Sequence, residues 1–151
     1  RTDETVTSLN LEEIQNLIPH RAPFLWIDRV LEVSETKITA EKFLPADLPV
    51  FEGHYPEFPV FPGVLQCEMA LQAGAILVAR GVQVEAGQVP VATRINNVKF
   101  KNLIRPGVTV QITAELTERM ANAFFFTGKV SVEGKTTATL EFACTAAAVG
   151  M

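Results

Sequence analysis

Hydrophobic and polar positions follow two different periods along this chain, and their order predicts the elements of the fold. Apolar residues between positions 11 and 18 recur at helical spacing, and Asn10 with Glu13 forms a capping-box pattern at their start. This pattern predicts a short amphipathic helix. Segments 24–33 and 37–43 are instead rich in apolar and β-branched residues, which is typical of strands.

A proline-rich stretch then leads into a long apolar segment. Prolines punctuate residues 45–62, and because each proline lacks an N–H donor, this stretch can form neither a continuous helix nor an inner strand. We predict a rigid, irregular loop. Pro62 and Gly63 open the apolar segment 64–80, and Gly81 can cap its end. Apolar residues cover almost every face of this segment, which predicts a helix buried nearly all round.

Further β-rich segments occupy the second half of the chain. They are residues 91–100, 108–117, 124–132 and 136–148, with Glu133-Gly134 as the expected hairpin turn. Strands on both sides of one buried helix, without alternation of strand and helix, predict an α+β fold in which an antiparallel sheet wraps around the helix. A length of 151 residues suffices for one core but not for two ordinary domains, so we predict a single domain over residues 1–151.

Composition narrows the classes of function. The formal net charge of -4 disfavours non-specific binding to nucleic acid, and no apolar run is long and uncharged enough to span a membrane. Cys67 lies in an apolar run and only Cys144 accompanies it, which favours a reducing cytoplasm over a disulfide-bonded secreted domain. The histidines and cysteines stand at scattered positions that do not have the spacing of a metal site.

The stretch GHYPEFPVFPGVLQCEMALQ, residues 53–72, carries the candidate chemistry. It places His54 in a proline-stiffened loop and Glu68 inside an otherwise apolar helix. Loss of hydration would favour the neutral form of Glu68, which could then donate a proton, while a neutral His54 could accept one. The N–H of Gly63 has no partner within the helix and could bind a developing oxyanion. A base, an acid and an oxyanion donor are what the elimination of water next to a thioester carbonyl requires.

Each of these residues also has a plainer explanation. A lone histidine in a loop is more often a surface or hydrogen-bonded residue than a catalytic one. A lone glutamate in an apolar helix usually lies at the solvent-exposed edge of that helix. A Pro-Gly pair is ordinary turn chemistry. The residues by themselves therefore leave catalysis open.

Three segments together resemble the (3R)-hydroxyacyl-acyl carrier protein dehydratases of fatty acid synthesis, of the type that uses His and Glu and has the hotdog fold. The segments are IPHRAPFLWIDRV, GHYPEFPVFPGVLQCEMALQ and VKFKNLIRPG, and they occur in the family's order and at similar separations. The resemblance spans most of the chain. It implies reversible dehydration of 3-hydroxyacyl thioesters on an acyl carrier protein to trans-2-enoyl thioesters, without a metal or an organic cofactor.

The resemblance also assigns roles to residues. His54 falls on the family's catalytic histidine, Glu68 on its catalytic glutamate, and Gly63 on the glycine whose amide polarises the thioester carbonyl. Gln72 matches a further helix position that supports the acid. Because the family's His and Glu meet across subunits, the resemblance implies a homodimer, often assembled as a trimer of dimers. His20 belongs to the PHRAPF marker, has no evident chemical partner and is interpreted as structural.

Departures from the family pattern concern the substrate and the carrier rather than the chemistry. Glu57 and Phe58 stand where many members carry a small residue and a cation, and Val108 replaces an acid. Because of Glu57 and Phe58, a second hypothesis stays open beside the dehydratase: a non-catalytic module that binds acyl carrier protein. The third hypothesis is a hotdog thioesterase. An intact His54 and Glu68 count against the binding module, and their spacing counts against the thioesterase.

Two further groups of residues are candidates for recognition. A basic patch for an acidic carrier protein is expected at Lys99, Lys101 and Arg105. The alternative is that they form the solvent face of a strand. The residues expected to line an acyl tunnel are Phe61, Leu65 and Phe100, with simple core packing as the alternative.

Overall fold

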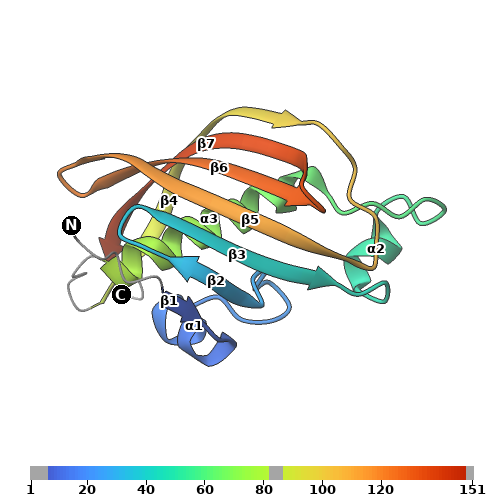
Figure 1. Cartoon of the computed structure of the whole chain (residues 1–151), viewed down its shortest axis with the longest axis horizontal. Coiled ribbons are helices and arrows are strands. Elements are labelled where there is room, and N and C mark those ends of the chain that lie inside the picture. Colours follow the sequence, from blue (N-terminus) through green and yellow to red (C-terminus); the bar gives the residue numbers. More distant parts are fainter. Residues whose placement is uncertain (1–6, 82–86, 149–151) are drawn as a thin grey trace.

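A curved antiparallel sheet and one long helix form the framework of the structure, a computed structural model that describes residues 7–81 and 87–148 (Figure 1). The helix is α3 (Gly63–Gly81), and the sheet wraps around it. Within the described residues the strands lie in the order β1 (Thr7–Leu9), β2 (Arg29–Val33), β3 (Lys37–Leu44), β5 (Val108–Met120), β6 (Ala123–Val132), β7 (Lys135–Ala148) and β4 (Gln88–Phe100). Every neighbouring pair is antiparallel. The predicted α+β architecture is confirmed.

Helix α3 packs close to the sheet because small residues stand where the two surfaces meet. A Cβ atom on Gly74 would lie 2.7 Å from Phe142 Cε2, and a Cβ atom on Gly128 of β6 would lie 3.0 Å from the Ala70 Cβ. The rings of Phe126 and Phe142 stack with their centroids 4.9 Å apart on this side of the sheet. Glycine is therefore needed on both α3 and β6 for the helix to pack this close to the concave face of the sheet.

The burial of α3 is complete at its centre and incomplete at its start. Residues 72–78 are all buried, which confirms the prediction for this part of the helix. The prediction is wrong for the first turn, where Val64 is 72% exposed. Glu68 and Leu71 are only partly buried, since this side of the helix faces a cavity rather than the sheet.

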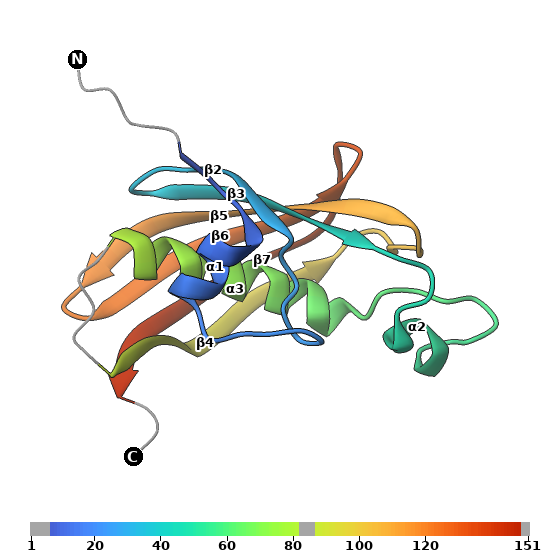
Figure 2. The ribbon, with the colours of Figure 1, turned by 90° about the horizontal axis from the view of Figure 1, so that it is seen from below.

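The N-terminal part of the chain covers the side of α3 that the sheet leaves open (Figure 2). It contains α1 (Leu11–Leu17), whose predicted capping box is confirmed. The Glu13 N–H donates to Asn10 Oδ1 at 2.9 Å, and the Asn10 N–H donates to Glu13 Oε1 at 2.9 Å. The preceding strand β1 was not predicted, because three residues are too few to show a period.

Residues 24–28 do not form a strand, so the prediction of a strand over 24–33 is wrong in its first half. Strand β2 begins at Arg29. The N–H of Trp26 donates to Gln72 Oε1 at 2.8 Å, and the carbonyl of Phe24 accepts from Gln72 Nε2 at 2.9 Å. These backbone groups are bonded to a helix side chain and are not available for a strand ladder.

The proline-rich stretch 45–62 is irregular for most of its length but contains a short helix that was not predicted. This helix, α2 (Pro49–Gly53), has Pro49 in its first turn, where the missing N–H is no loss, and it buries Phe51. Pro45 precedes this helix, the other prolines follow it, and the chain stays irregular until Gly63. The expectation of a loop without a helix is therefore wrong for five residues and holds for the rest.

The second half of the chain forms the strands that were predicted, each with somewhat different ends. The turn between β6 and β7 lies at Glu133 and Gly134, as expected, with φ angles of 50° and 79°. Two successive residues with positive φ are typical of the tight turn that matches the twist of a hairpin. The hairpin prediction is confirmed.

Strand β4 forms an edge of the sheet, where it is paired with β7 alone among the described strands. Several of its apolar side chains are exposed: Val91 is 38% exposed, Ile95 44% and Phe100 54%. A long edge strand with exposed apolar residues is a surface typical of pairing with another chain. Across residues 7–81 and 87–148, the structure contains no helix with the length and hydropathy needed to cross a membrane.

Candidate active site

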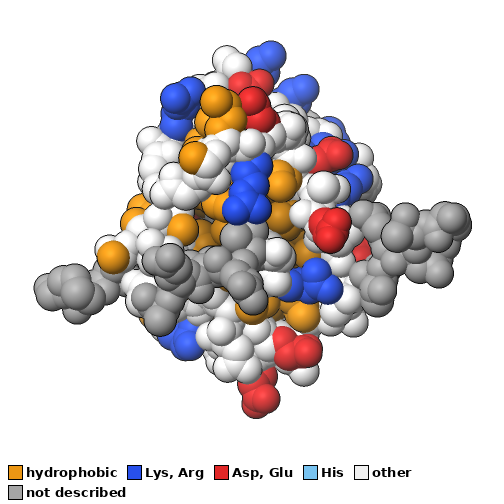
Figure 3. Space-filling model, turned by 90° about the vertical axis from the view of Figure 1, so that its left-hand side faces the viewer, with side chains coloured by type: hydrophobic (Ala, Val, Ile, Leu, Met, Phe, Trp, Pro, Cys, Tyr) orange, Lys and Arg blue, Asp and Glu red, His pale blue; other side chains and the backbone are white. Residues whose placement is uncertain are grey.

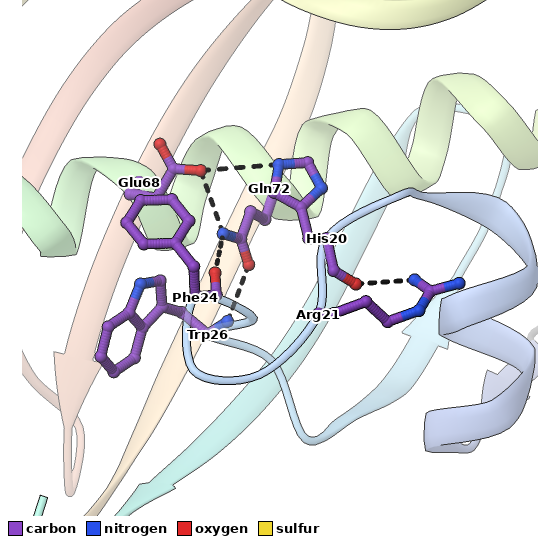
Figure 4. A network of polar contacts seen from close by, with 6 residues as sticks. All are labelled: His20, Arg21, Phe24, Trp26, Glu68 and Gln72. Atoms are coloured by element: carbon purple, nitrogen blue, oxygen red, sulfur yellow. Dashed lines mark hydrogen bonds and ion pairs between the residues drawn. The ribbon is translucent and has the colours of Figure 1, made fainter.

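The carboxylate of Glu68, in the second turn of α3, is held by the side chain one turn later (Figure 4). Gln72 Nε2 donates to Glu68 Oε2 at 3.0 Å and to the Phe24 carbonyl at 2.9 Å, while its Oε1 accepts from the Trp26 N–H at 2.8 Å. Because a backbone N–H can only donate, the orientation of the Gln72 amide is determined. Gln72 therefore faces Glu68 as a hydrogen-bond donor.

A second histidine lies beside Glu68. The loop after α1 brings His20 Nε2 to 3.8 Å from Glu68 Oε2, with 26% and 22% of the two side chains exposed. The expectation that His20 has no chemical partner is therefore wrong, whereas its interpretation as a structural residue stays a prediction. The PHRAPF segment drew attention to this residue, but no spacing within the sequence indicates its contact with a helix so far along the chain.

His54 lies directly after α2 and is partly buried. Its Nδ1 is 2.9 Å from the carbonyl oxygen of Val60. Since a carbonyl oxygen only accepts, this contact places the hydrogen on Nδ1 and leaves Nε2 with a free lone pair in the neutral ring. The ring of Tyr55 packs edge-on against His54 with the centroids 4.7 Å apart. Nε2 is thus the nitrogen that can accept a proton.

Gly63 begins α3, and the ring of Phe100 from the end of β4 lies against it. A Cβ atom at Gly63 would come within 2.8 Å of Phe100 Cε1, so only glycine admits this approach. Among the described residues, no hydrogen-bond acceptor is recorded for the Gly63 N–H. An N–H in the first turn of a helix has no intrahelical partner and carries the positive end of the helix dipole. It is suited to binding a carbonyl oxygen.

The site residues do not all meet within one chain. Glu68, Gln72 and His20 form one group, and Gly63 and Phe100 form another. Over the part of the chain that the structure describes, no hydrogen bond or ion pair joins either group to His54.

A cavity of about 370 Å³ opens beside Glu68. Its polar wall contains His20 and Glu68, and its apolar walls include Leu71 of α3, Val91 of β4, and Phe142 and Cys144 of β7. Burial raises the pKa of the Cys144 thiol to about 11 and also raises that of Cys67, so both thiols are protonated at neutral pH. The cavity thus joins one carboxyl group to an apolar space, as a site for an acyl chain would.

The residues expected to line an acyl tunnel lie outside this cavity. Phe61 is buried in the core, with its ring centroid 5.2 Å from that of Trp26. Leu65 is partly buried against the same core. Phe100 lines a different hollow, of about 720 Å³, together with Lys101 and Leu103. The role of Phe61, Leu65 and Phe100 stays a prediction.

The basic residues expected to bind a carrier protein do not line one common hollow. Lys99 lies on the outer face of the sheet with Lys129 of β6. Lys101 lines the hollow at Phe100. The guanidinium of Arg105 lies 3.7 Å above the ring of Phe58, so these two residues form a cation–π contact at the surface.

Charged side chains of both signs share the surface. On the face drawn in Figure 3, Lys and Arg side chains are interspersed with Asp and Glu instead of gathering by sign. Residues 7–81 and 87–148 contain no group of three or more His, Cys, Asp or Glu that could hold a metal ion.

Comparison with known sequences points to one family. Residues 30–141 match the sequence model of the ApeI-like family, described as ApeI dehydratase. The 3-hydroxyacyl-(acyl-carrier-protein) dehydratase FabZ of Rickettsia canadensis (strain McKiel) is 40% identical over 135 residues, which cover 89% of this chain and 94% of that protein. The FabZ of Clostridium perfringens (strain SM101 / Type A) is 37% identical over 127 residues, which cover 84% and 91% of the two chains.

Solved structures share the fold at lower identity. The dehydratase heterocomplex ApeI:P from Xenorhabdus doucetiae superposes with a TM-score of 0.73 at 17% identity, covering 87% of this chain and 89% of that chain. The fluoroacetyl-CoA thioesterase FlK gives a TM-score of 0.63 at 18% identity, covering 74% and 84%. Because dehydratases and thioesterases both appear, the fold alone does not choose between the two reactions.

Proposed function

Because this chain belongs to the FabZ-like 3-hydroxyacyl-(acyl-carrier-protein) dehydratases, we propose that His54 is the base and Glu68 the acid with which it removes water from its substrate. The family membership establishes the reaction, the dehydration of a 3-hydroxyacyl thioester carried by acyl carrier protein. The observation that carries the two roles is the opposite environment of the side chains. The neutral His54 ring presents the lone pair of Nε2, because Nδ1 faces the Val60 carbonyl, whereas Glu68 accepts the Gln72 amide on one oxygen only.

The proposed reaction uses three groups. His54 Nε2 removes the proton from C2, next to the thioester carbonyl, and the C2–C3 double bond forms. The Gly63 N–H binds the carbonyl oxygen as negative charge develops on it. Glu68 gives its proton to the hydroxyl on C3, the C3–O bond breaks, and water leaves. The reverse sequence hydrates a trans-2-enoyl thioester to the (3R)-3-hydroxyacyl thioester that the family resemblance implies.

We propose that a complete site needs two copies of the chain. No hydrogen bond or ion pair joins His54 to Glu68 within the described part of one chain, and the exposed edge of β4 offers a surface on which a second copy can pair. In the resulting homodimer, His54 of one copy faces Glu68 of the other. A trimer of dimers is the larger assembly that we also propose, and a measurement of the molecular mass in solution would distinguish it from the dimer.

Mixing two inactive variants tests this arrangement. His54→Ala and Glu68→Gln are expected to be inactive alone, but a mixed dimer regains one intact site out of two. Since half of the randomly mixed dimers are of this kind, co-expression should restore about a quarter of the native activity. Mixed dimers without activity would show that both groups of a site come from one chain.

The proposal extends to the acyl chain and the carrier. The cavity beside Glu68 has apolar walls that suit the acyl chain, and Lys101 and Arg105 lie near exposed aromatic residues where an acidic carrier protein could dock. The unpaired thiols of Cys67 and Cys144 support a reducing compartment, the cytoplasm, as the place of reaction.

One assay separates dehydration from the other hypotheses. The absorbance of the conjugated thioester is followed when the protein meets a 3-hydroxyacyl or a trans-2-enoyl thioester, and free thiol is measured in parallel. A dehydratase interconverts the two substrates, and His54→Ala and Glu68→Gln each lose at least about a hundredfold in rate. Release of free thiol would indicate a thioesterase, and binding of the acyl carrier without conversion would indicate a binding module.

A further inference from the structure

His20 is the group beside Glu68 that the proposed reaction does not use. Its backbone is fixed by the next residue, since Arg21 Nη1 donates to the His20 carbonyl at 2.7 Å and to the Ile18 carbonyl at 2.9 Å, while Nη2 donates to the Gln15 carbonyl at 2.9 Å. Figure 4 shows the imidazole turned from this anchor toward Glu68. His20 also lines the cavity that opens beside Glu68.

The two oxygens of Glu68 differ in their surroundings. Oε2 accepts from Gln72 Nε2 and also lies 3.8 Å from His20 Nε2. For Oε1 the structure records no partner among the residues it describes. Because the Gln72 amide can face Glu68 only as a donor, a proton on Oε2 would point at another proton. A neutral Glu68 therefore carries its proton on Oε1.

The hydrogen-bond partners of His20 indicate which of its two ring nitrogens carries the hydrogen in the neutral form. His20 Nδ1 is buried and has no hydrogen-bond partner among the described residues. A hydrogen on Nδ1 would be a buried donor without an acceptor, which costs more than an unused lone pair. The neutral ring therefore carries its hydrogen on Nε2, the nitrogen that faces Glu68 Oε2.

We propose that His20 is a positioning residue for the acid: its Nε2–H and the Gln72 amide hold Glu68 Oε2 from two sides, so that Oε1 presents the proton to the departing hydroxyl. The inference rests on the proposed role of Glu68 as the acid. A separation of 3.8 Å exceeds a direct hydrogen bond, and catalytic contacts of this kind tighten when substrate binds. The role requires an N–H donor at this place and no charge.

A change of leaving group separates positioning of the acid from a general structural role. From a 3-hydroxyacyl thioester the hydroxyl must be protonated to leave, whereas from a 3-fluoroacyl thioester fluoride leaves without a proton. In both reactions His54 takes the C2 proton and the same enoyl thioester forms. Fluoride release can be measured with an electrode beside the absorbance of the product.

Three variants are compared on the two substrates. His20→Leu is expected to lower kcat for the 3-hydroxyacyl substrate about tenfold or more, with KM unchanged within about twofold, and to leave the 3-fluoroacyl substrate nearly unaffected. His20→Gln keeps an amide donor near the position of Nε2 and should recover much of the loss. Glu68→Gln serves as the reference, with a larger loss that is also confined to the 3-hydroxyacyl substrate.

Each result has one meaning. An equal loss on both substrates in His20→Leu, or no loss on either, overturns the role of His20. A loss in His20→Leu that His20→Gln does not recover also overturns it, since the donor would then be irrelevant. A Glu68→Gln variant that loses both substrates equally instead refutes the proposed role of Glu68, whatever the His20 variants do.

Discussion

Replacing Gln72 by leucine should damage the acid and the fold together, in amounts that the structure allows us to separate. Gln72 is only 1% exposed, and its amide bonds to Glu68, the Phe24 carbonyl and the Trp26 N–H. Leucine is similar in size and removes all three bonds. The perturbation is therefore a loss of polar contacts with little change in volume.

The cost in stability comes mainly from one group. Trp26 is buried, so its N–H would be left without an acceptor, which costs about 1–3 kcal/mol. The bond to the Phe24 carbonyl is only partly buried, so we expect water to replace the lost donor there. We expect the free energy of unfolding to fall by about 1–3 kcal/mol, which moves the urea midpoint by about 1 M.

The cost in activity comes from Glu68. Without the amide donor, the Glu68 carboxyl group is free to rotate and to carry its proton on either oxygen. We expect kcat for dehydration to fall about tenfold or more, measured at a temperature where the variant is fully folded. The fluorescence of Trp26, the chain's single tryptophan, reports unfolding in the same samples.

Gln66→Leu is the matched control. Gln66 is also a buried glutamine of α3, 2% exposed, but its Oε1 accepts from Thr137, whose hydroxyl has Val130 as another acceptor. Its loss should lower stability to a smaller extent and leave kcat unchanged. If Gln72→Leu is destabilised as expected but dehydrates at the native rate, the amide serves the fold alone and the reasoning about Glu68 is refuted.

Further predictions test the packing of α3 and the chemistry of the buried thiol. Gly74→Ala should lower the free energy of unfolding by about 1–3 kcal/mol, because the new Cβ would lie 2.7 Å from the buried ring of Phe142; an unchanged urea midpoint would contradict this packing. Gly63→Ala keeps the N–H but places a Cβ against the half-exposed ring of Phe100, which can turn away, so we expect native stability. If the thioester carbonyl approaches the N–H of residue 63 closely, the added methyl group should lower kcat/KM at least about tenfold, and native kinetics would contradict that close approach. Because burial raises the pKa of Cys144 to about 11, roughly a thousandth of its thiol should be ionised at pH 8. Its labelling by iodoacetamide, read by mass spectrometry of the peptide, should therefore rise with pH up to about 11 and become fast in urea. Rapid labelling of the folded protein at pH 8 would contradict its burial.

Local signals in the sequence determined the elements that depend on neighbouring residues. The capping box at Asn10, the turn at Glu133 and the apolar helix from Gly63 can each be recognised within a few residues, because hydrogen bonds and φ angles at these places are set by adjacent positions. The same holds for His54 and Glu68 as candidates, since a glutamate inside an apolar helix is visible in the sequence itself.

Only the tertiary structure decided what lies beside these residues. Residues 24–28 look like a strand, yet they are held by Gln72, a side chain far along the chain whose amide takes their backbone hydrogen bonds. His20 reaches Glu68 through the same loop, and the apolar residues of β4 stay exposed because that strand lies at the edge of the sheet. These contacts join distant positions, and a periodic pattern records which face of an element is apolar but not which element covers it.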